Sequence, residues 1–287
     1  MTTFLQQVFN GLTLGSIYGL VALGLTLVYG ILHIPNFAHG ALYMVGAFMS
    51  YFFMVDMGVH YWIAMAGSAV VVAVLGIICE RLVFHQLRNS PPIHDKIAAI
   101  GILLFLEAMV HMFWGSEFRR MSSPFGGVMN LDGVYLREQG ILIIASTVVL
   151  VVALNLFLRK TMVGATIIAM AQNREGAFLV GIDANRVAMM TFAISGGLAA
   201  IAATLYAPLN LVYPAMGHLV IMKAFVIIIL GGMGSIPGAI VGGMIIGFAE
   251  AFGGYYISTA YKDVIAFSLL VVILSIRPQG LFAKGAH

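Results

Sequence analysis

The amino-acid sequence predicts an all-α polytopic membrane protein with about eight transmembrane elements, including broken or re-entrant helices, in two related halves. Of its 287 residues, 61% are hydrophobic and only 9% are charged, whereas soluble domains carry about 25% charged residues. Mean hydropathy is +1.03. A soluble fold of this length needs more charge to cover its surface. Composition therefore excludes a soluble domain, a disordered chain, a disulfide scaffold and a nucleic-acid binder.

Long unbroken apolar runs favour helices over barrel strands. A spanning helix needs about 20 apolar residues, whereas a barrel strand alternates over about ten. The predicted spans lie at 5–31, 36–55, 61–80, 97–114, 141–158, 187–212 and 261–276. A further apolar region, 219–252, is too long for one helix and is interrupted at Gly231–Gly238. It either crosses twice or dips in as a re-entrant pair, and we treat residues 1–287 as one transmembrane domain.

Basic residues orient the chain, because lysine and arginine concentrate in cytoplasmic loops. They mark the segment 159–186 and the C-terminal tail as cytoplasmic: Arg159, Lys160, Arg174, Arg186, Arg277 and Lys284. Counting spans back then places loop 81–96 in the cytoplasm, and loop 115–140 and the N-terminus outside. The outer loop contains Gly and Pro turn signals. It is interpreted as irregular structure that is either a docking surface or a plain connector.

Two segments, 29–48 and 230–247, look alike, since each has an apolar run, a Gly/Pro break and a run of small residues. Broken helices at matching positions of two halves point to a transport site, because irregular backbone at membrane depth must lie inside protein or along a water-filled cavity. The simpler alternative is that the glycines only let helices pack closely. The first interpretation makes the residues at the breaks candidates for lining a solute pathway: Asn36, Phe37, His39, Gly234, Ser235 and Pro237.

Ionisable residues inside the predicted spans are few, and each is costly there. Glu107 and His111 share one helix face and are expected to pair. Lys223 is expected to snorkel to the interface, and Glu250 lies near the end of the broken region. These groups are too few for a proton relay to be the favoured interpretation.

The sequence contains no H-E-x-x-H zinc motif, no G-x-S-x-G elbow and no G-x-x-x-x-G-K-[ST] P-loop. It therefore predicts a chain that is not an enzyme and that holds no metal and no cofactor. Any ATP that drives it must be bound by another subunit.

The cytoplasmic segment 159–186 carries the strongest functional signal. Residues 161–180 have an apolar stripe at helical spacing, and Gly181 is a plausible helix stop. Such a helix fits a partner's groove or lies on the lipid surface, and the residues alone do not separate these two possibilities.

Four motifs occur in order along the chain: Thr26–Gly30 with Asn36–Gly40, Glu175-Gly176-Ala177 with Gly181-Ile182-Asp183, Gly231–Ala239, and Arg277–Phe282. Together they resemble the permease subunits of branched-chain amino acid ABC transporters, and the short N-terminus is similar to the shorter of the two permease types. The resemblance covers about residues 5–283 and implies an importer subunit in a prokaryotic inner membrane.

The resemblance also implies partners. These are a second, homologous permease, two cytoplasmic ATPase subunits that bind ATP, and an extracytoplasmic substrate-binding protein. The implied contacts with an ATPase are Arg174, Glu175, Gly176, Ala177, Gly181 and Asp183. Similar permeases are associated with branched-chain amino acids, with urea and short amides, or with aromatic acids. The alternative function is a gradient-driven secondary transporter or channel with Glu107 or Glu250 as its coupling site. An intramembrane enzyme is a third hypothesis, but no catalytic constellation supports it.

Overall fold

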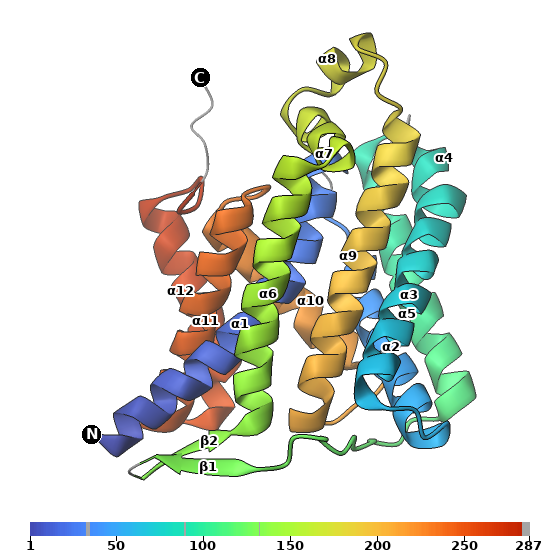
Figure 1. The fold of residues 1–287 in the computed structure, drawn as a ribbon. Helices are drawn as coiled ribbons and strands as arrows, with labels where there is room; N and C mark the ends of the chain where they lie inside the picture. Colours follow the sequence, from blue (N-terminus) through green and yellow to red (C-terminus); the bar gives the residue numbers. More distant parts are fainter. Residues whose placement is uncertain (33–34, 89, 132, 283–287) are drawn as a thin grey trace.

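A computed structural model describes residues 1–32, 35–88, 90–131, 133–282 of the chain (Figure 1). The helices of the membrane bundle are α1 (Thr2–Leu32), α2 (Ala38–Tyr51), α3 (Tyr61–Cys79), α5 (Pro92–Trp114), α6 (Glu138–Lys160), α9 (Ala184–Tyr206), α10 (Met216–Gly231), α11 (Ile236–Tyr256) and α12 (Lys262–Ile276). Shorter helical turns extend several of them: η1 (Phe52–Asp56), η2 (Glu80–Phe84), α4 (His85–Leu87), η3 (Ala207–Leu209) and η4 (Thr259–Tyr261). Outside the bundle lie α7 (Met162–Gln172), α8 (Arg174–Leu179) and an antiparallel hairpin of β1 (Val128–Leu131) and β2 (Val134–Arg137).

Within the described residues, 8 helices are long and apolar enough to cross a membrane, and α10 is a shorter apolar helix. The prediction of an all-α polytopic membrane protein is confirmed. The N-terminus and the hairpin lie at one end of the bundle, and α7 and α8 lie at the other (Figure 1). This arrangement agrees with the sidedness derived from the basic residues. Lys284, used in that derivation, lies outside the described residues.

Helix α1 forms the centre of the bundle and is buried over most of its length. Glycines let it approach α11 closely: a β-carbon on Gly15 would lie 2.9 Å from the Cα of Met244, and one on Gly243 would lie 2.5 Å from the backbone nitrogen of Gly19. Small residues are how helices pack in lipid, where van der Waals contact drives association. Packing therefore accounts for the small residues after the second break.

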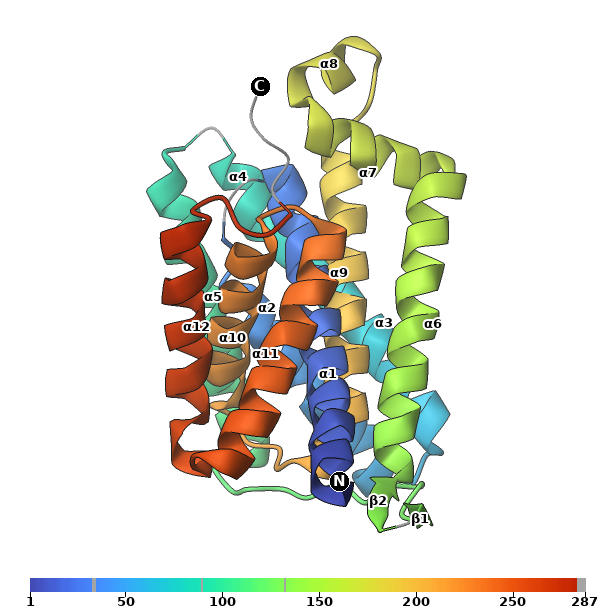
Figure 2. The same cartoon turned by 90° about the vertical axis from the view of Figure 1, so that its left-hand side faces the viewer.

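The two breaks that look alike in sequence differ in geometry. After the first, the chain turns back into the bundle, so that His39 in the first turn of α2 lies beside Val21 of α1. The second is a tight turn at the end of the bundle that carries α7 and α8, where α10 and α11 meet as antiparallel helices (Figure 2). The region 219–252 thus lies in two antiparallel helices joined at this turn, of which α11 is long enough to span a membrane and α10 is shorter. Residues 33–34 of the first break lie outside the described part of the chain.

The predicted cytoplasmic loop 81–96 is largely helical. Helix α3 continues through η2 and α4 to Leu87, and α5 begins already at Pro92. No glycine or proline interrupts residues 80–87, whereas the Pro91-Pro92 pair ends the connection and starts α5, as proline favours the first helical turn. The prediction of an irregular outer loop is also incomplete, because Val128–Leu131 and Val134–Arg137 form the two strands of the hairpin.

Candidate functional site

The cytoplasmic segment consists of two helices, not one continuous helix. Thr161 caps the start of α7, since its Oγ1 accepts from the backbone N–H of Gly164 at 3.0 Å. Asn173 caps the start of α8, since its Oδ1 accepts from the N–H of Gly176 at 2.9 Å. Asn173 is extended, with φ −154° and ψ 102°. Asparagine in this conformation is a favoured helix start, which explains why the apolar stripe is broken there.

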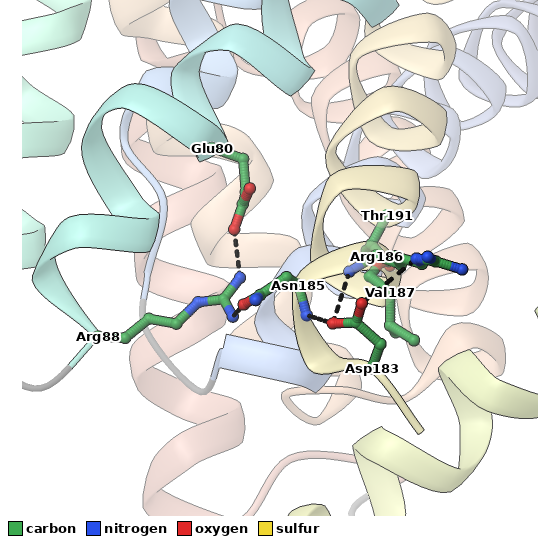
Figure 3. Close-up of polar contacts among 7 residues, drawn as sticks. All are labelled: Glu80, Arg88, Asp183, Asn185, Arg186, Val187 and Thr191. Atoms are coloured by element: carbon green, nitrogen blue, oxygen red, sulfur yellow. Dashed lines mark hydrogen bonds and ion pairs between the residues drawn. The ribbon is translucent and has the colours of Figure 1, made fainter. Parts of the chain in front are cut away.

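Helix α8 ends where the sequence predicts. Gly181 adopts a φ of +80°, and the N–H of Ile182 donates to the carbonyl of Ala177 at 3.1 Å. This bond and the positive φ are the signature of a Schellman helix end, which glycine permits. Asp183 then caps α9, since its Oδ1 accepts from the N–H of Asn185 at 2.9 Å (Figure 3).

Helix α8 projects beyond the end of the bundle (Figure 1), and the apolar side chains at its end are exposed. Phe178, Leu179 and Val180 are 53%, 89% and 76% exposed, and we name these three residues the docking surface, after the role proposed for them below. Of the predicted coupling residues, Arg174, Glu175, Gly181 and Asp183 are exposed around it, Gly176 is half-buried and Ala177 is buried. Sequence reasoning selected the polar and small residues of the motif but missed the docking surface. The pattern that could have identified it is an apolar triplet at the end of a segment that is expected in the cytoplasm.

A polar link joins the end of this segment to α3 (Figure 3). Arg88 Nη1 donates to Asn185 Oδ1 at 2.5 Å, and the same guanidinium pairs with the buried carboxylate of Glu80. A buried carboxylate without a cation is strongly unfavourable. Asn185 lies in the first turn of α9, next to the Asp183 cap, so this link connects the start of α9 to the extended end of α3.

Ionisable side chains inside the membrane bundle gather around α10. Glu107 Oε2 lies 2.7 Å from His218 Nε2, in the first turns of α10. The expected Glu107–His111 pair is wrong: His111 Nδ1 instead lies 3.1 Å from Ser116 Oγ. The prediction considered only residues on one face of α5, whereas the partner of Glu107 is His218 of α10, 111 positions away in the sequence.

Lys223 also differs from its expectation. Its side chain does not simply extend to the membrane interface but contacts polar groups of three other helices. Its Nζ lies 2.8 Å from Glu250 Oε1 and 3.1 Å from Asp263 Oδ1, and it donates to the Tyr18 hydroxyl at 3.0 Å. The Tyr18 hydroxyl in turn donates to Glu250 Oε2 at 2.7 Å. One cation therefore ties α10 to α1, α11 and α12.

Of the candidate pathway residues of the first break, Asn36 and His39 are buried and Phe37 is half-buried. The side-chain oxygen of Asn36 accepts from the N–H of Ala38 at 3.0 Å, and its amide nitrogen has no partner among the described residues. His39 Nε2 lies 3.0 Å from the carbonyl oxygen of Val21, and its Nδ1 lies 3.2 Å from Ser195 Oγ. The Phe37 ring lies 4.7 Å from that of Phe225 on α10.

The candidate residues of the second break lie at the cytoplasmic turn. Ser235 Oγ accepts from the N–H of Gly238 at 3.2 Å, and Pro237 is in the first turn of α11. A β-carbon on Gly234 would lie 3.9 Å from the Cα of Gly30 on α1. His39 of the first set lies beside Val21 of α1, and Val21 is nine residues, or about 14 Å of helix, from Gly30. The structure therefore separates the two candidate sets by depth and does not unite them in one cavity.

Comparison with known proteins identifies the family to which the chain belongs. The family described as "Branched-chain amino acid transport system / permease component" matches residues 7–274. The chain is 38% identical over 98% of its length, and 96% of the relative, to the high-affinity branched-chain amino acid transport system permease protein LivH of Escherichia coli (strain K12). It is 36% identical, over the same shares, to the permease protein BraD of Pseudomonas aeruginosa. In fold it is similar to a chain of PsaBC from Streptococcus pneumoniae in complex with Fab, with a TM-score of 0.52, 11% identity, and coverage of 97% of this chain and 93% of that chain.

Proposed function

Since the chain belongs to the family of branched-chain amino acid permease components, a family of ABC transporter subunits in the bacterial inner membrane, we propose that it forms one half of a branched-chain amino acid import pathway. The observation that carries the proposal is the 38% identity to LivH over 98% of the chain. The chain is a transport subunit in this proposal, and ATP hydrolysis takes place in partner subunits.

A cytoplasmic ATPase subunit binds the docking surface together with the exposed residues Arg174, Glu175, Gly181 and Asp183. The half-buried Gly176 and the buried Ala177 belong to the same coupling motif and support α8 from beneath. Exposed apolar side chains in water gain free energy when a partner covers them. Phe178, Leu179 and Val180 form such a group on the cytoplasmic side of the bundle. The polar link from Asn185 through Arg88 to Glu80 supports transmission of a docking movement to α3.

A second, homologous permease faces α10 across the pathway. A half-exposed ionisable side chain at membrane depth must meet protein or water and not lipid. The side chain of His218 is 45% exposed and pairs with Glu107, so this face of α5 and α10 is unsuited to lipid. The outer hairpin is the proposed contact for a substrate-binding protein.

Asn36, Phe37, His39, Gly234, Ser235 and Pro237 remain proposed pathway residues in this mechanism. Asn36 supports the assignment, because its buried amide nitrogen has no partner in the described part of the chain. A buried unpaired donor is costly. A shift of α2 that admits a solute would provide an acceptor. Alternating access then requires one bistable element that nucleotide and loaded binding protein both bias.

Reconstitution tests the function. The chain, its second permease and two ATPase subunits are placed in liposomes, with binding protein outside and ATP inside, and uptake of labelled leucine, urea and benzoate is measured. ATP-dependent uptake of leucine is the expected result. Leucine uptake by the chain alone, without ATPases, would instead establish a gradient-driven carrier or channel. ATP-dependent uptake of urea or benzoate in place of leucine would keep the transporter and overturn its substrate.

A further inference from the structure

A cavity of about 690 Å³ opens at the extracytoplasmic end of the bundle. Its walls come from the first turns of α1, the hairpin, the start of α6 and the neighbouring ends of α9, α11 and α12. These elements lie at the same end of the bundle (Figures 1 and 2). The volume lies in the range of sites for small organic ligands, about 300–1,000 Å³. The cavity is separate from the docking surface, which lies at the opposite end.

The charge of the lining is one-sided. Arg137 and Lys262 both line the cavity, and its lining contains no aspartate or glutamate among the described residues. Neither cation makes an ion pair within the described part of the chain. Amide side chains of α1, Gln6, Gln7 and Asn10, add neutral hydrogen-bonding groups on the same wall. This set suits an anion.

Part of the lining is apolar and includes Phe9, Leu14 and Leu209. The cavity also lies at the level of an aromatic cluster, since Tyr255 lines it and Tyr256 and Tyr261 are exposed nearby. Tyrosine collects where hydrocarbon meets head groups. The ligand therefore combines an anionic group with an apolar part at the membrane–water interface.

We propose that this cavity binds the phosphate head group of an anionic phospholipid from the outer leaflet, with Arg137 and Lys262 as its cationic contacts. A zwitterionic amino acid fits less well, because no carboxylate in the described lining can pair with its ammonium group. The head group places its phosphate between the two cations, and its glycerol and first acyl carbons contact Phe9 and Leu14. Arginine in particular offers a planar, weakly hydrated donor fork to phosphate.

Native mass spectrometry of the purified full-length chain, assembled with its partner subunits, tests the site. The sample is taken from nanodiscs of phosphatidylcholine and phosphatidylglycerol, and retained phosphatidylglycerol is counted. The attraction between one basic residue and an anionic lipid surface corresponds to about a fivefold change in lipid binding. We expect Arg137→Gln to lower retention about fivefold and the Arg137→Gln/Lys262→Gln variant to lower it further.

Arg120→Gln is the matched control, because Arg120 is an exposed cation of the same outer loop that does not line the cavity. It should retain phosphatidylglycerol as the unaltered chain does. Thr259→Trp, at an exposed lining position, should exclude the lipid without loss of charge. Equal retention in all variants would overturn the proposal. Displacement of the lipid by millimolar inorganic phosphate would overturn the lipid assignment in favour of a free-anion site.

Discussion

Gly40 and Gly217 lie against each other's carbonyl oxygens where α2 crosses α10. A β-carbon on Gly40 would lie 2.5 Å from the Gly217 oxygen, and one on Gly217 would lie 2.6 Å from the Gly40 oxygen. Both glycines are in the first turns of their helices. The crossing that sets the depth of α2 and α10 therefore has no room for a methyl group on either helix.

Alanine at this crossing is expected to destabilise the protein. Gly40→Ala forces the backbones of α2 and α10 apart, and overpacking of this kind costs about 1–3 kcal/mol. Thermal unfolding in detergent measures the loss. Gly101→Ala is the matched control, because Gly101 is a helical glycine of α5 at which a β-carbon would meet nothing within 4 Å. That variant should be as stable as the unaltered chain or slightly more stable, and equal loss in both would contradict the crossing.

A charge on the docking surface is expected to weaken binding of the ATPase. Leu179 is 89% exposed, so Leu179→Glu leaves the fold intact but removes the burial of a leucine, which is worth about tenfold or more in affinity. Co-purification of ATPase subunits with the tagged chain measures the effect. Met129→Glu introduces the same charge on the outer hairpin and should leave co-purification unchanged. Normal ATPase recovery with Leu179→Glu would place docking elsewhere.

Loss of the Glu107–His218 contact is expected to reduce uptake. Glu107→Gln replaces the carboxyl partner of His218, whose Nε2 lies 2.7 Å from Glu107 Oε2, and the loss of such a hydrogen bond is worth about tenfold in an equilibrium. ATP-driven uptake in the reconstituted system is the measurement. His111→Gln is the control, since His111 lies one turn further along α5 and contacts Ser116. If the two variants transport equally, the pair has no part in the pathway.

Removal of the shared cation is expected to destabilise the bundle. Lys223→Met leaves the buried Glu250 carboxylate without its cation, and breaking such a pair costs about 3–5 kcal/mol. The midpoint of thermal unfolding should fall accordingly. Lys223→Met/Glu250→Gln should recover most of the loss, because no uncompensated charge then remains buried. A double variant as unstable as Lys223→Met alone would show that the alkyl chain, not the charge, matters.

Local patterns predicted much of this molecule. Apolar runs of spanning length identified the helical membrane class, the span count placed the segment 159–186 and the outer loop at opposite ends of the bundle, and Gly181 identified the end of α8. Each depends on the chemistry of residues that are neighbours along the chain. Helix length, helix termination and residence in lipid are decided within one segment, so composition and spacing suffice for them.

Contacts between segments that are distant in the sequence could not be predicted from local patterns. Fold class and family motifs followed from the amino-acid sequence alone. The packing of the helices was needed to establish that Glu107 meets His218 and not His111, that Lys223 joins four helices, and that elements distant in the chain enclose the outer cavity. An unpaired charge in the membrane takes the nearest partner in space, and that partner is set by helix packing rather than by distance along the chain.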